Sequence, residues 1–170
     1  MKLSGKVWKL RNDVSVLDLL PAKYDDLGVN EKWAECATHL LEDVDPHFAS
    51  AMQPGDIIVA DEMLGVGHAH YYRATILACK ASGIGALLAE SLVDVFQRGA
   101  IDQGLPTWAY PGLSAFVEAG DTLEFDLASG EARNITQGTA ASFIPLSPVI
   151  LDILAADGGF GWAKKRAARG

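Results

Sequence analysis

The chain has 170 residues, the length of one globular domain, and 49% of them are hydrophobic, enough to bury a core. Its formal net charge of −8 argues against a nucleic-acid partner, because a phosphate-binding face requires an excess of Lys and Arg. No apolar run is long enough to span a bilayer, and the first residues lack the apolar core of a signal peptide, so no membrane partner is expected.

The first third of the chain predicts one strand followed by short helices. Asn30 is expected to cap the first full helix, and Pro46 is tolerated in the first turn of the next. In chain order we expect a strand at 5–10, a strand or single helical turn at 14–20, a polar connection at 25–30, and helices at 31–41 and 45–52.

The segment 55–91 predicts a strand, a glycine loop, a helix and a second strand. The apolar runs 57–60 and 86–89 have the length of short buried strands. Between them, one helical face is indicated by the spacing i, i+3, i+7, i+10 of Ala69, Tyr72, Ile76 and Cys79. This order of elements is a βαβ unit with a parallel pair of strands.

The remainder of the chain predicts antiparallel strands and two closing helices. In order these are a helix at 92–103, a strand at 108–110, a hairpin of 120–127 with 131–136, a strand at 138–143, a helix capped by Ser147 and a tail helix to 170. A βαβ unit combined with antiparallel pieces indicates the α/β class with a mixed sheet. We expect residues 1–170 to form a single domain with a C-terminal helical tail from about 147.

The glycine loop carries the chemistry of a small-ligand site. Gly65 and Gly67 can adopt positive φ and allow a ligand close to the backbone, and the helix N-terminus behind them favours an anion. His68 and His70 add groups that exchange protons near neutral pH. The loop therefore predicts a small carboxylate ligand, and the alternative is a tight turn with two solvated histidines.

The cysteines restrict which cofactors this chain can bind. Cys36 and Cys79 lie in helical patterns and are interpreted as small core residues. Two cysteines in such positions cannot hold an iron–sulfur cluster or a structural zinc, so no metal or cofactor is expected in this chain. Their number and setting fit a reducing cytoplasm.

Several stretches of the chain stand in a characteristic order. They run from Gly5-Lys-Val-Trp-Lys near the start to Gly120-Asp-Thr-Leu-Glu-Phe-Asp-Leu-Ala-Ser-Gly130. Between these two lie 19–24, 43–49, 54–60, the Gly65-Val-Gly67 loop and 96–106. In order and spacing these stretches resemble the small subunit of 3-isopropylmalate dehydratase, the separate swivelling domain of the aconitase superfamily. The resemblance covers nearly the whole chain, about residues 4 to 165.

The resemblance implies a fold, a partner and a reaction. It implies a three-layer β/β/α swivelling domain that docks on a large subunit carrying a [4Fe–4S] cluster, with the active site between the two subunits. The family's Gly-Cys-Gly loop is followed by Ser-Ser-Arg, which supplies the base and a guanidinium for a substrate carboxylate. The reaction is the reversible removal and addition of water on a hydroxy di- or tricarboxylic acid.

The chain departs from the family pattern at the catalytic loop. His68-Ala69-His70 stands in place of Ser-Ser-Arg, and Val66 stands in place of the cysteine. Upstream, Ser15-Val16-Leu17 replaces an Asp-Thr-Asp run, which makes the site more apolar. The predicted catalytic residues are therefore His68 and His70. The predicted substrate-binding residues are Gly65, Gly67, Ala69 and Arg73.

Three interpretations of this loop remain open. The first is a working hydro-lyase subunit with altered specificity, in which His68 takes the proton and His70 pairs with a carboxylate of a less charged, alkyl-substituted acid. The second is a non-catalytic assembly or regulatory partner of the large subunit. The third is a metal-binding His-x-His pair, for which no further His or Glu follows at a useful spacing.

Overall fold

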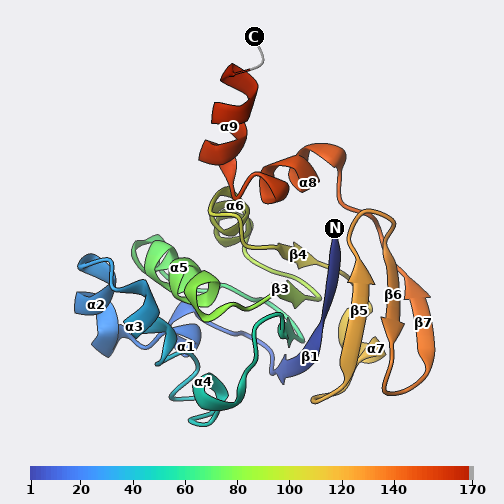
Figure 1. The fold of residues 1–170 in the computed structure, drawn as a ribbon. Coiled ribbons are helices and arrows are strands. Elements are labelled where there is room, and N and C mark those ends of the chain that lie inside the picture. The colour runs from blue at the N-terminus through green and yellow to red at the C-terminus, as the bar shows by residue number, and fades with distance from the viewer. Residues whose placement is uncertain (169–170) are drawn as a thin grey trace.

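The computed structural model describes residues 1–168, which form a seven-stranded sheet in the order β4-β3-β2-β1-β5-β6-β7 (Figure 1). The strands are β1 (Lys2–Leu10), β2 (Ile57–Ala60), β3 (Ala86–Ala89), β4 (Thr107–Ala109), β5 (Thr122–Asp126), β6 (Glu131–Asn134) and β7 (Thr139–Ser142). Strands β4, β3, β2 and β1 are parallel, whereas β5, β6 and β7 continue the sheet in antiparallel fashion. The α/β class with a mixed sheet is therefore confirmed.

The long strand β1 belongs to both halves of the sheet. Its second half, Val7–Leu10, pairs in parallel with β2. Its first half, Lys2–Lys6, pairs antiparallel with β5. The carboxylate of Asp56 fixes this junction, because it accepts hydrogen bonds from the backbone N–H of Lys6 at 3.1 Å and from the indole N–H of Trp8 at 2.8 Å.

Most of the helices lie against the parallel half of the sheet, whereas the short helix α7 lies beside the antiparallel strands (Figure 1). The described chain also contains two short 3₁₀ turns. The helices are α1 (Val16–Leu19), α2 (Asp25–Val29), α3 (Trp33–Ala37), α4 (Phe48–Ala51), α5 (Tyr72–Ser82), α6 (Asp94–Asp102), α7 (Leu113–Phe116), α8 (Pro148–Ala155) and α9 (Gly159–Ala167). The 3₁₀ turns are η1 (Ala22–Tyr24) and η2 (Ala69–Tyr71).

Two hydrophobic cores lie on opposite faces of the parallel strands. Ile58 and Leu87 point into the core shared with the helices. Ile57 and Leu88 point into a second core, where they meet Phe125 and other side chains of the antiparallel half. Successive strand residues face opposite sides, so each short parallel strand contributes to both cores. The result is the three-layer β/β/α arrangement that the family resemblance implies.

The predicted βαβ unit is present. Strands β2 and β3 match the predicted runs 57–60 and 86–89, and they pair in parallel across α5. Tyr72, Ile76 and Cys79 of the predicted helical face are buried, and Gly83 ends the helix with φ 87°. Ala69 differs: it is exposed, because η2 precedes the α-helix and turns this residue away from the core.

The antiparallel elements also match their predictions. Strands β5, β6 and β7 lie within the predicted hairpin and the strand that follows it. The hydroxyl of Ser147 accepts a hydrogen bond from Ile150 N–H and so caps α8, and α9 forms the predicted tail helix. Residues 169–170 of that tail lie outside the described residues. The short helix α7 was not predicted.

The first third of the chain is more helical than its sequence indicates. Residues 14–20 adopt the single-turn alternative, with Ser15 and Asp18 forming a capping box. The polar connection predicted at 25–30 is wrong, because Asp25–Val29 is helix α2. The predicted cap by Asn30 is also wrong: its side chain donates back to the Asp26 carbonyl, and Glu31 has a left-handed φ of 56°. Helix α3 therefore begins only at Trp33.

The second predicted helix also starts late. The carboxylate of Asp45 accepts a hydrogen bond from the backbone N–H of His47 at 3.0 Å, and α4 begins at Phe48 rather than at Asp45. A carboxylate that bonds a backbone N–H two residues later forms a local turn in place of a helical one.

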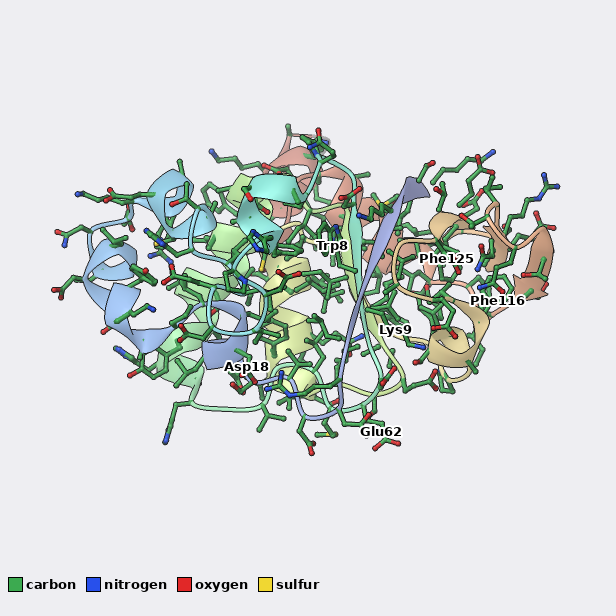
Figure 2. All side chains as sticks on the ribbon, turned by 90° about the horizontal axis from the view of Figure 1, so that it is seen from below. Trp8, Lys9, Asp18, Glu62, Phe116 and Phe125 are labelled. Atoms are coloured by element: carbon green, nitrogen blue, oxygen red, sulfur yellow. The ribbon has the colours of Figure 1, made fainter. Side chains whose placement is uncertain are left out.

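The ends of the parallel strands define one edge of the sheet, called here the carboxyl edge. The loops 11–15, 61–68, 90–93 and 110–112 follow β1, β2, β3 and β4 there. Figure 2 shows Asp18 and Glu62 at this side of the molecule, whereas Phe125 and Phe116 lie in the antiparallel half. In open α/β sheets the carboxyl edge is where ligands bind, so the predicted glycine loop lies in the expected place.

The buried hydroxyl of Tyr110 generates a stability prediction. Tyr110 is 1% exposed, its ring packs on Phe125 at 4.7 Å, and its hydroxyl has no hydrogen-bond partner among residues 1–168. A buried, unpaired hydroxyl destabilises the folded state. We expect Tyr110→Phe to keep or raise the free energy of unfolding, by up to about 1 kcal/mol in urea titration. A loss of more than about 1 kcal/mol would contradict this interpretation.

A cluster around Glu42 generates a prediction about pH. Its carboxylate accepts hydrogen bonds from Lys23 at 2.8 Å and Tyr24 at 2.6 Å and contacts His39 at 2.8 Å. These three partners lower the pKa of the Glu42 carboxyl from 4.5 to about 2, and the hydrogen bond from Lys23 has the largest effect. A carboxyl whose pKa is lowered by folding stabilises the fold above its unfolded pKa, and this contribution is lost as pH falls.

We therefore expect Glu42→Gln to lower the melting temperature near neutral pH, with a deficit that shrinks as pH falls from 4.5 towards 2. Thermal unfolding across this pH range measures the deficit. The matched control is Glu35→Gln, because Glu35 forms an exposed pair with Lys32 and should show a small deficit at every pH. A deficit for Glu42→Gln that stays constant over the same range contradicts the prediction.

Candidate functional site

The glycine loop is anchored on both sides by backbone hydrogen bonds. Gly65 N–H donates to the Val14 carbonyl at 2.9 Å, and Val16 N–H donates to the Val66 carbonyl at 2.8 Å. On the other side, Leu64 N–H donates to the Ser91 carbonyl at 3.1 Å. Residues 64–66 thus act as a short bridging strand between the loops after β1 and β3.

Both loop glycines are required by close packing as well as by backbone conformation. Gly65 has φ +87°, and a Cβ at this position would lie 2.5 Å from the ring of Phe96. Gly67 has φ +133°, and its Cβ would lie 2.9 Å from Cγ2 of Val16. A substitution at either position is strained in the backbone and collides with a buried side chain.

The turn after Gly67 presents backbone donors to solvent. Tyr71 N–H donates to the His68 carbonyl at 3.1 Å, and the Tyr72 hydroxyl donates to the Gly67 carbonyl at 3.1 Å, which holds the turn closed. Within residues 1–168, the backbone N–H groups of 67–70 have no acceptor. A run of unpaired N–H groups at the start of a helix favours an anion.

The two predicted histidines have different surroundings. His68 begins η2 in an extended conformation, and its imidazole is exposed with no hydrogen-bond partner among residues 1–168. The imidazole of His70 is 64% exposed and lies 3.5 Å from the carboxylate of Asp25 on α2. The structure therefore leaves His68 free at the loop and pairs His70 with an acidic residue.

Arg73 is also engaged by the helical layer. Its guanidinium lies 2.9 Å from the carboxylate of Glu31 and 5.0 Å from the centre of the Trp33 ring. Sequence reasoning missed both acidic partners, because it placed Asp25 in a polar connection and Glu31 at the start of a helix. The pairs are more than 40 positions apart in the chain, and no local pattern indicates them.

Four exposed apolar side chains belong to the loop after β2 and to the helices that follow the loops bridged to it. Met63 and Val66 lie in the loop after β2, Leu17 in α1 and Val95 in α6. Their exposed fractions are 37% for Leu17, 38% for Met63, 36% for Val66 and 59% for Val95. Exposed apolar groups that gather on one face are typical of a surface that contacts a ligand or a partner.

A polar cluster closes the far side of this edge. The ammonium of Lys9 donates to the carbonyls of Ser114 at 3.0 Å and Val117 at 3.2 Å. The Ser114 hydroxyl donates to Asp61, and the carboxylate of Glu90 accepts from the backbone N–H groups that begin α7. These contacts attach α7 to the strand ends, so their role is structural.

The chain's own residues do not fit an iron–sulfur cluster. Cys36 and Cys79 are free and fully buried in α3 and α5, as predicted for core residues. Burial raises the pKa of the Cys79 thiol to about 12. Among residues 1–168, no three His, Cys, Asp or Glu side chains are placed to share a metal ion. No helix of the described chain has the length and apolar character to cross a membrane.

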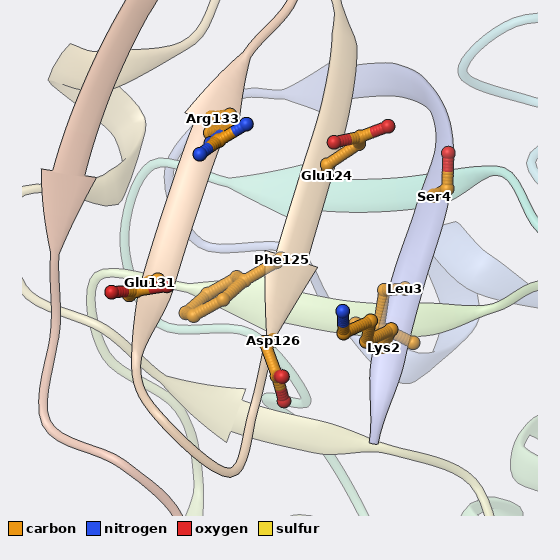
Figure 3. A pocket seen from close by; sticks show the side chains of 8 residues that line it. All are labelled: Lys2, Leu3, Ser4, Glu124, Phe125, Asp126, Glu131 and Arg133. Carbon is orange, nitrogen blue, oxygen red and sulfur yellow. The ribbon is translucent and has the colours of Figure 1, made fainter.

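A shallow depression lies on the outer face of β1, β5 and β6 (Figure 3). Its lining side chains carry both signs of charge. They are Lys2, Leu3, Ser4, Glu124, Phe125, Asp126, Glu131 and Arg133. None of these residues belongs to the glycine loop, so the depression is not part of the predicted site.

Comparison with known proteins places this geometry in a family. No family model matches the chain. The 3-isopropylmalate dehydratase small subunit of Thermodesulfovibrio yellowstonii is 37% identical over 166 residues, which cover 98% of this chain and 96% of that protein. The isopropylmalate/citramalate isomerase small subunit of Methanocaldococcus jannaschii is 36% identical over 166 residues, with the same coverage.

Solved structures agree with these relatives. The crystal structure of 3-isopropylmalate dehydratase from Methanocaldococcus jannaschii matches with a TM-score of 0.88 at 28% identity, covering 99% of this chain and 96% of that one. Aconitase X from Thermococcus kodakaraensis shares the fold at a TM-score of 0.51 and 16% identity, over 85% of this chain and 91% of that one. The resemblance noted in the sequence is confirmed, and the chain belongs to the family of 3-isopropylmalate dehydratase small subunits.

Proposed function

We propose that this protein is the small subunit of a two-subunit hydro-lyase that removes and adds water reversibly on a hydroxy-dicarboxylic acid. The observation that carries the proposal is the loop 65–70, where free backbone N–H groups and the exposed imidazole of His68 meet at the carboxyl edge. Relatives of similar length are named as small subunits of isopropylmalate dehydratase or isomerase, which supports the same assembly here.

Proton transfer is assigned to His68. Dehydration requires a base that removes a proton next to a carboxylate, and hydration requires the same group to return it. An imidazole suits this task near neutral pH, because its neutral form accepts the proton and the imidazolium so formed returns it. His68 is exposed and unpaired at the start of η2, so it is free to reach a substrate held by the neighbouring N–H groups.

Carboxylate binding is assigned first to the backbone of the loop. Gly65 and Gly67 adopt the positive φ that this turn requires, and the N–H groups of 67–70, that of Ala69 among them, have no acceptor within residues 1–168. His70 and Arg73 are the side chains that would add positive charge. In the free subunit each is held by an acidic residue, Asp25 or Glu31, and must exchange that partner for a substrate carboxylate. Exposed pairs of this kind contribute only about 0–1 kcal/mol, so little free energy is lost when a substrate carboxylate replaces the acidic partner.

We also propose that the substrate carries an alkyl group and less charge than a tricarboxylic acid. Leu17 and Val66 are exposed beside the loop, and they offer apolar contact rather than hydrogen bonds. The pairing of His70 and Arg73 with acidic residues lowers the net positive charge of the site. Both features favour an acid with an apolar substituent over a more highly charged one.

The large subunit is assigned the [4Fe–4S] cluster, because both cysteines of this chain are buried in the helical core. The isolated chain is then inactive, and the active site forms when the two subunits meet. The two free thiols suit a reducing compartment, so we place the assembly in the cytoplasm.

A specific observation favours a second candidate function. His70 and Arg73 are both engaged with acidic side chains, and His68 has no residue that orients it within the described chain. A subunit that only assembles with or regulates the large subunit would tolerate this arrangement. The kinetic test of His68 separates this candidate from the catalytic one.

The first test concerns His68. In the assembled enzyme we expect His68→Ala to lower turnover by about two to four orders of magnitude, because the general base is lost. Steady-state kinetics across pH measures the effect. His47→Ala is the matched control, since His47 is an exposed histidine beside α4, outside the loop, and should leave turnover unchanged. A turnover within about threefold of wild type for His68→Ala supports the non-catalytic candidate.

The second test concerns His70 and its partner Asp25. We expect His70→Ala to raise KM more than it lowers kcat, because His70 contacts a substrate carboxylate in both the ground and the transition state. Asp25→Asn should lower KM, because it releases His70 from its pair. In the His70→Ala background, Asp25→Asn should have no effect on KM, and this double-mutant cycle isolates the pair. Additive effects of the two substitutions exclude the assigned role of His70.

A further inference from the structure

Helix α9 stands apart from the body of the protein (Figure 1). None of its residues, Gly159–Ala167, is buried, and its neighbours within residues 1–168 are α6 and α8. A helix of nine residues is only marginally stable in water when it is isolated. Its stability therefore depends on packing, and this helix has little packing within its own chain.

The exposed surface of α9 combines aromatic and basic groups. Phe160 is 74% exposed, and the ammonium of Lys164 lies 4.4 Å from the centre of its ring. The guanidinium of Arg166 lies 4.9 Å from the ring centre of Trp162. These cation–π contacts hold both charges along the helix and expose them to an approaching surface. With Lys165, the helix carries three basic residues and no acidic ones.

The rest of the chain has the opposite charge. Four of the 14 basic residues, and none of the 22 acidic residues, follow Gly158, so residues 1–158 carry a formal charge of −12. A body this acidic repels nucleic acid and anionic membranes. It attracts a basic helix, and a second copy of this chain presents the same acidic body.

We propose that α9 is a docking arm for a second copy of this chain, with its basic and aromatic surface lying against the acidic body of the partner. A two-fold pair uses such a contact twice, because each arm meets the body of the other copy. The aromatic side chains supply apolar area in the contact, and the three cations supply charge complementarity. This inference does not depend on the proposed catalytic role.

The test measures the mass of the purified full chain by sedimentation equilibrium at about 0.05 M and about 0.5 M salt. We expect a mass of two copies at low salt and dissociation at high salt, because salt screens exposed charge pairs. Lys164→Gln, Lys165→Gln and Arg166→Gln combined should weaken association at least about tenfold, and Phe160→Ala should weaken it as well.

The matched control removes the same amount of charge elsewhere. Lys2, Lys32 and Arg98 are exposed positions outside α9, and because replacing all three by Gln makes the body more acidic, this combination should not weaken association. Circular dichroism verifies that every variant keeps its fold. A single-copy mass for wild type at both salt concentrations overturns the proposal, and so does association that survives the α9 substitutions.

Two further outcomes also overturn the proposal. In one, the chain stays a single copy alone and α9 is needed only to bind the large subunit, which assigns the arm to that partner. In the other, a labelled oligonucleotide binds with a dependence on Lys164, Lys165 and Arg166, as fluorescence anisotropy would show. That result would mean that the three cations overcome the repulsion from the acidic body.

Discussion

The sharing of strand β1 between two sheet halves is the constraint on which the rest of the structure depends. Residues Lys2–Lys6 pair with β5 and residues Val7–Leu10 pair with β2, so the antiparallel layer is held against the parallel one by a continuous backbone. Close packing at the junction requires glycine: a Cβ on Gly5 or Gly85 would collide with the carbonyl of Gly55. The parallel strands start together at this point, and their carboxyl ends lie together at the carboxyl edge.

The carboxyl edge, where the parallel strands end, positions the backbone of the candidate site. The bridging residues 64–66 are held between the loops that follow β1 and β3, so the glycine loop is fixed at its start while the N–H groups of 67–70 have no acceptor within residues 1–168. The side chains behave differently, since His70 and Arg73 lie beside acidic residues of the helical layer. Backbone donors on a fixed turn and side chains in exchangeable pairs suit a site that a second subunit completes.

Much of the fold could be predicted because its signals are local. The βαβ unit follows from two apolar runs around a helical period, and the hairpin follows from alternation in β5 and β6. Prediction is less accurate for the first third of the chain, because its helices are short and held by distant contacts. Asn30 bonds back to Asp26 instead of capping α3, and Glu31 turns left-handed, so a favourable cap residue was overridden.

For the site, the sequence by itself determined the family, the glycine loop and the chemical nature of its side chains. The glycines are explained by short-range sterics, and the exposed His68 follows from its place at a helix start. Only the tertiary structure decided which charges meet: Asp25 lies beside His70 and Glu31 beside Arg73, across more than 40 residues of chain. Such pairs arise when helices pack side by side, and packing depends on the whole core rather than on neighbouring residues.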